Sequence, residues 1–332
     1  MSRVGLGSEQ STKMRVLVTG GAGFIGAHLV RRLIQDGYAD VTVLDNLKRG
    51  SFEALSDCRD RFRFIRGSIT DRELLRRAMM ECGVVFHLAA QSNVIGAAQD
   101  PDYTFNTNVL GAFEVLRAAR HCKAVRVVFT SSREVYGETE GGTVSEICPL
   151  RPKNPYGASK AIGEILCSSF SDTGLEAVIL RLANVYGPGD SERVIPIFVE
   201  NALSGKPLFL FGGTQVIDFV WVGTVIDALI RAGFGAWVQE PVNVGSGVGT
   251  RLTDLARRIC VLTGSESEIR FAPARSIEVE HFIADIRRAS QVFDITRPDE
   301  PLFGLPQVVD SFRAKPENSQ CWTLAKETPA AL

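Results

Sequence analysis

The chain has 332 residues, 45% of them hydrophobic, and its 37 basic side chains nearly balance 38 acidic ones, for a formal net charge of −1. A nearly neutral chain lacks the basic surplus that nucleic acids and anionic membranes attract, so neither is expected as a partner. No apolar run is long enough to cross a bilayer. The seven cysteines are scattered, without a CxxC pair or a histidine cluster, which predicts reduced thiols in a cytoplasmic protein and no metal site.

The first half of the chain alternates short apolar runs with longer segments of helical periodicity. Six apolar runs predict buried strands: MRVLVTG (14–20), VTVLD (41–45), FRFIR (62–66), VVFHLA (84–89), VRVVFTS (125–131) and EAVILRL (176–182). The segments 24–37 and 108–122 carry apolar residues at helical spacing. Strands that are hydrophobic on both faces and alternate with helices predict an α/β fold with a doubly wound parallel sheet, the Rossmann arrangement.

After Asn184, prolines and glycines separate shorter elements, which predicts a smaller, discontinuous C-terminal substrate domain. The expected division is a disordered tail over 1–13, a Rossmann domain over 14–183 with return segments near 215–245, the smaller domain over 184–214 and 246–313, and a tail over 314–332.

The motif TGGAGFIG follows the first strand directly and opens the first helix. Gly20, Gly23 and Gly26 have the spacing of a dinucleotide-binding turn: the first permits the turn, the second lets backbone N–H groups approach a pyrophosphate, and the third lets helix and strand pack closely. Asp45 ends the second strand, where a carboxylate can accept both ribose hydroxyls and repel a 2′-phosphate. These residues predict NAD binding in preference to NADP.

The motif NPYGASK places Tyr156 and Lys160 one helical turn apart, just downstream of the strand that ends near Ser132. A phenol with an ordinary pKa of about 10 is a poor base at neutral pH. A neighbouring ammonium and a positive nicotinamide ring would favour the phenolate and lower that pKa. The three residues therefore predict proton removal from an alcohol, with Ser132 orienting the hydroxyl while a hydride leaves for NAD.

Taken together, these motifs resemble the nucleotide-sugar epimerase/dehydratase group of the extended short-chain dehydrogenases/reductases, of which UDP-glucose 4-epimerase is the familiar member. The likeness extends over residues 14–312 and is carried, in the family's order, by TGGAGFIG, LDNLKRG, HLAAQSNV, NVLGAFEVLRAA, TSSREVYG, NPYGASKAIGE, RLANVYGP and VNVGSG. It implies a resident NAD and a nucleoside-diphosphate sugar as substrate, with a UDP-sugar expected first.

The resemblance also implies roles for individual residues, with Ser132, Tyr156 and Lys160 as the catalytic set. The expected cofactor contacts are Gly20, Gly23, Phe24, Ile25, Gly26, Asp45, Asn46, Ser68, Ile69, Leu88, Ala89, Ala90, Asn108, Tyr156, Lys160 and Ala183. The expected substrate contacts are Ser92, Ser132, Asn184, Arg193, Arg275 and Glu278. In the family pattern the counterpart of Arg275 clamps a phosphate, and the counterpart of Glu278 binds the nucleoside ribose.

Three positions depart from the family pattern. Ser68 stands where an aspartate usually contacts adenine, and Ile277 replaces the glycine of the phosphate-clamping turn. Ile217 occupies the place of an arginine that normally makes a charge-assisted bond to the substrate pyrophosphate. Either Arg275 works alone, Arg193 substitutes, or the substrate is not an ordinary nucleoside-diphosphate sugar.

Arg133 and Glu134 follow Ser132, where plain 4-epimerases of the group usually have small or neutral residues. The stretch S-R-E-V-Y-G resembles sugar-nucleotide 4,6-dehydratases and decarboxylases, in which a glutamate works beside the substrate. A 4-epimerase needs one proton acceptor, whereas a dehydratase must also remove a proton from carbon 5, for which a carboxylate is the natural base. Glu134 is therefore either catalytic or a structural partner of Arg133. Dehydratases often place a second acid before this glutamate, and Arg133 is not one.

We therefore expect an NAD-dependent nucleotide-sugar 4-epimerase of the UDP-glucose/galactose type, working through a 4-keto intermediate with tightly bound NAD. A dehydratase or decarboxylase that uses Glu134 is the alternative in the same class. An NAD-sensing binding protein would have no use for an intact Ser-Tyr-Lys set, and an alcohol or steroid reductase would consume free cofactor. Family members commonly pair helices corresponding to 103–121 and 156–171, which predicts a homodimer.

Overall fold

The structure is a computed structural model that describes residues 14–37, 39–139 and 141–314. Both predicted tails lie outside these residues, apart from Ala314. Within the described residues, no helix has the length and apolar character needed to cross a membrane.

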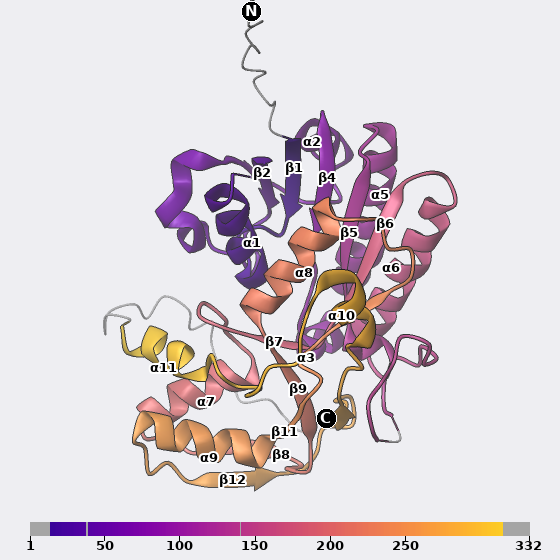
Figure 1. The fold of residues 1–332 in the computed structure, drawn as a ribbon. Coiled ribbons are helices and arrows are strands. Elements are labelled where there is room, and N and C mark those ends of the chain that lie inside the picture. The colour runs from indigo at the N-terminus through magenta and orange to yellow at the C-terminus, as the bar shows by residue number, and fades with distance from the viewer. Residues whose placement is uncertain (1–13, 38, 140, 315–332) are drawn as a thin grey trace, which may run out of the picture.

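A seven-stranded parallel sheet forms the larger layer of the fold, in the order β10-β6-β5-β4-β1-β2-β3 (Figure 1). Its strands are β1 (Met14–Thr19), β2 (Ala39–Asp45), β3 (Arg63–Arg66), β4 (Cys82–His87), β5 (Arg126–Ser132), β6 (Glu176–Leu182) and β10 (Val242–Val244). The order reverses between β1 and β4, which is the switch point where open α/β sheets bind ligands. The predicted doubly wound Rossmann fold is confirmed.

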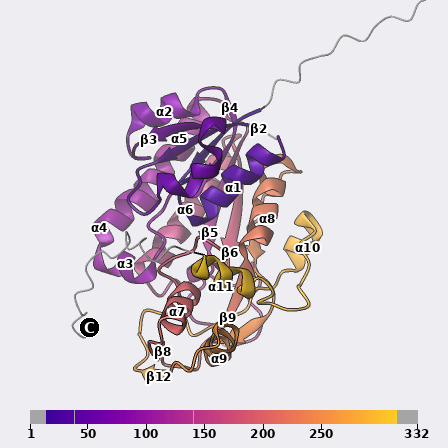
Figure 2. The same cartoon turned by 90° about the vertical axis from the view of Figure 1, so that its left-hand side faces the viewer.

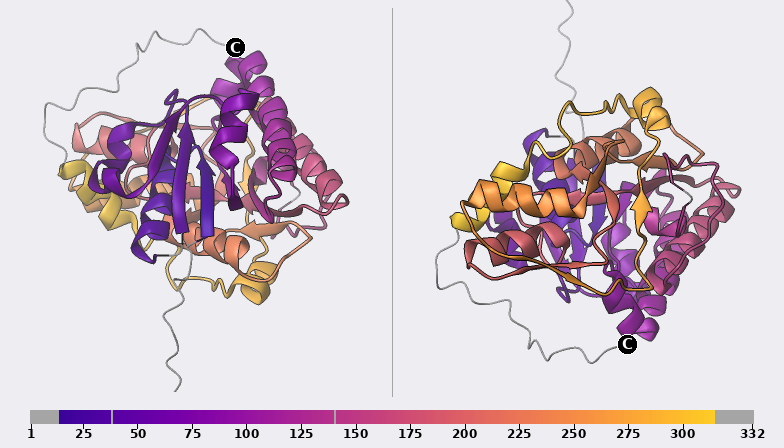
Figure 3. Two further views of the ribbon diagram at one scale, coloured as in Figure 1. Left: turned by 90° about the horizontal axis from the view of Figure 1, so that it is seen from above. Right: turned by 90° about the horizontal axis from the view of Figure 1, so that it is seen from below.

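Helices cover both faces of this sheet (Figure 3). One face packs against α1 (Phe24–Gln35) and α8 (Val222–Phe234), and the other against α2 (Arg72–Met79), α5 (Gly111–His121) and α6 (Pro155–Ser171). Side chains alternate along each strand, so that in β1 Val16 and Val18 join the first layer while Leu17 joins the second. Burial of both faces explains the unbroken apolar runs of these strands.

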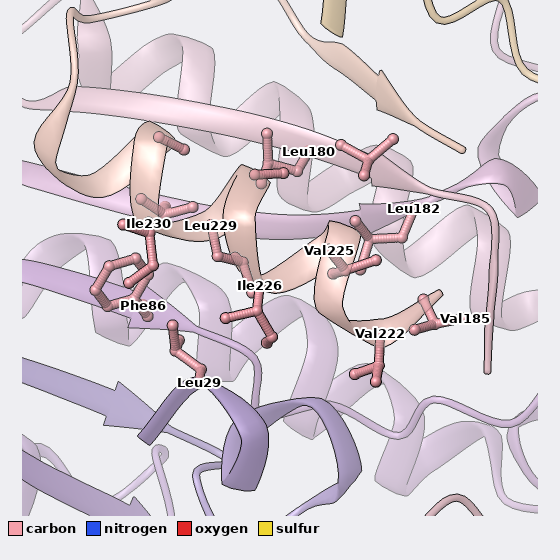
Figure 4. Close-up of a cluster of buried hydrophobic side chains, with 14 of the residues drawn as sticks. Leu29, Phe86, Leu180, Leu182, Val185, Val222, Val225, Ile226, Leu229 and Ile230 are labelled. Carbon is pink, nitrogen blue, oxygen red and sulfur yellow. The ribbon is translucent and has the colours of Figure 1, made fainter. Parts of the chain in front are cut away.

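Helix α8 closes the first face although it lies far along the chain from the first strands. Figure 4 shows Ile226 and Leu229 of α8 between Leu180 of β6 and Leu29 of α1, with Val225 one turn before Leu229. All five side chains belong to one buried cluster. This packing attaches the C-terminal half of the chain to the main sheet.

A smaller group of elements lies at the carboxyl end of the main sheet (Figures 1 and 2). Its strands are β7 (Asn184–Tyr186), β9 (Val216–Trp221), β11 (Gly249–Arg251) and β13 (His281–Phe282), which form one sheet, and β8 (Leu208–Phe211) and β12 (Ile269–Ala272), which form another. Its helices are α7 (Val194–Leu203), α9 (Leu252–Thr263) and α11 (Leu305–Arg313), which share an apolar core with β8 and β9.

The remaining elements connect these layers. They are η1 (Phe52–Arg61), α3 (Val94–Gln99), α4 (Pro101–Thr104), the π-helix η2 (Phe105–Leu110), the short η3 (Arg133–Val135) and α10 (Arg287–Phe293).

Candidate active site

The turn between β1 and α1 brings glycine backbones into close contact. Gly20 has a positive φ of 73°, and a Cβ added to it would fall 2.6 Å from the backbone nitrogen of Ala89. A Cβ on Gly26 would fall 2.2 Å from the carbonyl oxygen of Gly20. Only glycine permits these approaches, which leave the N-terminus of α1, at Gly23 and Phe24, open to an anionic pyrophosphate. The residues present therefore fit a dinucleotide.

Asp45 ends β2 beside this turn. Its Oδ2 accepts a hydrogen bond from the Ala22 N–H at 3.0 Å, and its Oδ1 accepts one from the Leu47 N–H at 2.8 Å. Burial raises the pKa of the Asp45 carboxyl, and these two bonds oppose the rise. A carboxylate has about four acceptor positions, so two remain for ribose hydroxyls. The neighbouring Asn46 accepts a hydrogen bond from the Lys48 N–H at 3.0 Å.

The other predicted cofactor residues follow the carboxyl ends of strands in the main sheet. Ser68 and Ile69 follow β3, Leu88, Ala89 and Ala90 follow β4, and Ala183 follows β6. Because parallel strands end at one edge, these residues gather on the side of the sheet that holds the glycine turn. Ile69 is buried in the second layer of the core, and the Ser68 hydroxyl bonds the Thr70 hydroxyl at 2.8 Å.

Asn108 is a buried residue of the π-helix η2. Its Oδ1 accepts from the Gln91 N–H at 2.7 Å, and its Nδ2 donates to the Gln91 carbonyl at 3.0 Å and to Ser159 Oγ at 2.9 Å. These bonds tie the loop after β4 to α6, the helix that carries Tyr156. Isolated π-helical turns often mark functional positions, because they redirect a side chain out of the regular helix.

Ser132, Tyr156 and Lys160 come together at the carboxyl end of β5. Ser132 is the last residue of β5, and the other two lie one turn apart in the first half of α6. The Ser132 side chain lies close enough to the Tyr156 hydroxyl to lower the pKa of the phenol. Lys160 Nζ donates to the carbonyl oxygen of Thr130 at 2.8 Å. One strand end and one helix face thus assemble the whole set.

Burial controls the proton affinity of both titratable members. It raises the pKa of Tyr156, against which the hydrogen bond with Ser132 and the charge of Arg193 act, while the charge of Glu134 raises it further. Burial lowers the pKa of Lys160 to about 8. Among the groups of the protein itself, desolvation outweighs the neighbouring positive charges, so the pKa of Tyr156 is raised. The predicted lowering of this pKa includes the charge of a bound nicotinamide ring and stays a prediction. A cation bound beside the phenol would favour the phenolate.

Arg133 and Glu134 form a buried ion pair next to Ser132. Arg133 Nη2 lies 2.8 Å from Glu134 Oε1, and Asn154 Nδ2 donates to Glu134 Oε2 at 2.7 Å. The Glu134 N–H donates to Ser132 Oγ at 3.3 Å, and Arg133 Nε donates to Asn184 Oδ1 at 2.7 Å. Both carboxylate oxygens of Glu134 therefore have partners, as expected for the structural role that the sequence left open.

Arg193 and Ser92 are predicted substrate contacts that come from separate loops. Arg193, directly before α7, pairs with Asp190, and its guanidinium lies 5.7 Å from the centroid of the Phe24 ring. Ser92 Oγ accepts a hydrogen bond from Arg49 Nη1 at 3.0 Å. Arg193 therefore lies near the start of α1, and Ser92 lies beside the loop that follows β2.

Arg275 and Glu278 lie on a loop between β12 and β13. Arg275 Nη1 donates to Glu278 Oε1 at 2.9 Å, and its guanidinium lies 3.6 Å from the centroid of the Phe211 ring. Asn154 Nδ2 also donates to the carbonyl oxygen of Ile277 at 3.1 Å, which ties this loop to the start of α6. Asn154 thus joins Glu134, near the end of β5, to the loop between β12 and β13, a role that the sequence analysis did not assign.

Ile217 lies in β9 and is 4% exposed. It belongs to the apolar core of the smaller part, together with Tyr186 and Phe219. Position 217 therefore contributes packing and no charge.

The profile of the "NAD dependent epimerase/dehydratase family" matches residues 16–245, more than half of the chain. The chain belongs to this family. A UDP-glucose 4-epimerase of Mycolicibacterium smegmatis is 38% identical over 305 residues, which cover 89% of this chain and 94% of the relative. The predictions of an enzyme of this family and of NAD as its cofactor are confirmed.

Solved structures of family members are similar throughout. A UDP-glucose 4-epimerase of Thermotoga maritima with UDP-glucose has a TM-score of 0.86 and 33% identity, covering 90% of this chain and 99% of that one. A dTDP-glucose 4,6-dehydratase of Streptomyces venezuelae with NAD bound has a TM-score of 0.86 and 32% identity, covering 90% and 97%. The fold alone therefore does not separate the predicted epimerase from its dehydratase alternative.

Proposed function

We propose that this family member is a nucleotide-sugar 4-epimerase of the UDP-glucose/galactose type, working through a 4-keto intermediate with tightly bound NAD. The observation that carries the proposal is the pairing of Glu134. Its two carboxylate oxygens are engaged by Arg133 and Asn154, at 2.8 and 2.7 Å. This leaves Tyr156 as the base beside Ser132, and a 4-epimerase requires one proton acceptor. The 38% identical 4-epimerase relative supports the same assignment.

In this proposal the residues of the chain divide the work. NAD, when bound, supplies the acceptor and donor of a hydride. Ser132 orients the hydroxyl at carbon 4 of the sugar, and Tyr156 Oη takes the hydroxyl proton and later returns it. The Lys160 ammonium, held by the Thr130 carbonyl at 2.8 Å, places a positive charge beneath the end of β5. The buried position of these groups keeps water away from the ketone.

The second candidate is a 4,6-dehydratase or decarboxylase, favoured by the position of Glu134 two residues after Ser132. Curated relatives include dTDP-glucose 4,6-dehydratases, one of them 36% identical over 75% of this chain. For this chemistry, Glu134 must direct one of the acceptor positions that Asn154 and Arg133 leave free toward the proton at carbon 5.

Product NMR in heavy water distinguishes the two candidates. The NAD-loaded enzyme is incubated with a panel of UDP-, dTDP-, GDP- and ADP-sugars. We expect a 4-epimer of a UDP-sugar without deuterium at carbon 5. A 4-keto product with deuterium at carbon 5 would instead assign the enzyme to the dehydratases.

We further propose a cytoplasmic homodimer that pairs the surfaces of η2 and α6. Both carry exposed apolar side chains, with Phe105 at 56% and Ile165 at 65% exposed. Light scattering should report about twice the chain mass of 36.2 kDa. Ile165→Glu should give a monomer, whereas Val261→Glu on α9, also highly exposed, should not. A wild-type protein that is monomeric at micromolar concentration would rule out the dimer.

A further inference from the structure

A buried nitrogen of Arg133 lacks a hydrogen-bond partner. Arg133 is 9% exposed, its Nε bonds Asn184 and its Nη2 pairs with Glu134. Its Nη1 is among four buried polar side-chain atoms of the described residues that have no partner. A buried donor left unpaired is unfavourable, so a ligand oxygen that reaches Nη1 forms a bond that the protein does not otherwise make.

The guanidinium of Arg133 contacts one residue of β7 and one residue of β13, two strands that pair with β9. In the parallel pairings of this small sheet, Phe282 of β13 is the partner of Ile217, and Asn184 of β7 is the partner of Phe219. Residues two apart in a strand share a face, so these four side chains lie on one face. Arg133 bonds Asn184 and lies 5.8 Å from the Phe282 ring centroid. It therefore contacts both strands that pair with β9 at Ile217 and Phe219.

The other predicted anion-binding residues are in a different environment. The side chains of Arg193 and Arg275 are 31% and 37% exposed, and each is paired with a carboxylate three residues away in the chain. Solvent weakens an ion contact at such positions. Arg133 has a free donor where water is largely excluded, so a charge-assisted bond there is stronger.

We propose that Arg133 binds an oxygen of the substrate diphosphate through Nη1 and so supplies the positive charge that position 217 lacks. The assignment rests on the proposed function, because it requires a nucleoside diphosphate. The proposal accounts for the absence of an arginine at position 217, because the guanidinium of Arg133 would supply the positive charge from the end of β5. An ordinary nucleoside-diphosphate sugar is then compatible with the chain.

The test compares Glu134→Gln with the double variant Arg133→Gln/Glu134→Gln. The comparison removes the cation without leaving an unpaired buried carboxylate. Calorimetry of the NAD-loaded proteins measures the affinity for UDP, uridine, UDP-glucose and UDP-glucuronate, and NAD content and thermal unfolding check the fold. We expect the double variant to bind UDP and both UDP-sugars about 10- to 100-fold more weakly than Glu134→Gln, with uridine unchanged. Adding Ile217→Arg to the double variant should restore UDP binding.

Other outcomes overturn the assignment. Equal affinity of both proteins for UDP would make Arg133 a purely structural partner of Glu134. A loss confined to UDP-glucuronate, with UDP unaffected, would assign Nη1 to a sugar carboxylate instead. If the wild-type protein binds none of UDP, dTDP, GDP and ADP, the proposed function is wrong as well. If it binds UDP but the two variants bind UDP equally, only the role of Arg133 is wrong. Arg257→Gln, an exposed change on α9, serves as the control and should leave every affinity unchanged.

Discussion

Replacement of Tyr156 by Phe is expected to lower turnover by about 10²- to 10⁴-fold, the usual contribution of a general acid–base group, while NAD remains bound. The change removes the phenol hydroxyl whose pKa the Ser132 side chain lowers and keeps the buried ring. Turnover is measured by product NMR, and NAD by its release on denaturation. Wild-type turnover in the Tyr156→Phe enzyme would exclude Tyr156 as the base.

Tyr186→Phe is the matched control for this variant. Tyr186 is also buried, and its hydroxyl donates to the Pro301 carbonyl at 3.1 Å in the core of the smaller part. Loss of that bond should lower the free energy of unfolding by about 1–3 kcal/mol and leave turnover within a few-fold. Comparison of Tyr186→Phe with Tyr156→Phe thus separates the effect of losing any buried hydroxyl from the effect of losing the hydroxyl proposed as the base.

The pH profile provides a second measurement of the same residue. A phenol accepts a proton only as the phenolate, so kcat/KM should fall as pH falls through the pKa of Tyr156. Glu134→Gln removes a negative charge that raises this pKa and should move the acidic limb to lower pH. Arg193→Gln removes a positive charge that lowers it and should move the limb to higher pH. Shifts in the same direction would contradict this electrostatic account.

Gly26→Ala is expected to abolish NAD binding and to destabilise the fold. The new Cβ would lie 2.2 Å from the Gly20 carbonyl oxygen and 2.7 Å from Gly21 Cα, so α1 must move away from the end of β1. Overpacking of this kind costs about 1–3 kcal/mol, and the shift also displaces the N–H groups that face the pyrophosphate. Calorimetric titration with NAD and thermal unfolding of the apoprotein measure the two effects.

Gly23→Ala separates these two effects. Its Cβ would lie 3.3 Å from the Gly20 carbonyl oxygen, so the neighbouring backbone need give only slightly. We expect near-normal unfolding with weaker NAD binding, because the methyl group enters the space predicted for the pyrophosphate. Full NAD content and an unchanged unfolding temperature in the Gly26→Ala protein would contradict the steric argument.

The sequence by itself determined the main sheet, the glycine turn and the spacing of Tyr156 and Lys160. These are local properties: apolar runs predict strands buried on both faces, and a four-residue interval places two side chains on one helix face. The six strands predicted in the first half all lie in the main sheet. The family followed from the same motifs, because their order and spacing require no knowledge of contacts between distant segments.

Only the tertiary structure decided how the charges around Ser132 are paired and which way the pKa of Tyr156 moves. Arg133 reaches Asn184 across 51 residues, and Asn154 reaches both Glu134 and the loop at Ile277. No periodicity encodes such contacts, since they depend on how separate elements pack. The pKa of the phenol likewise depends on its burial, which a list of neighbouring charges in the sequence does not contain.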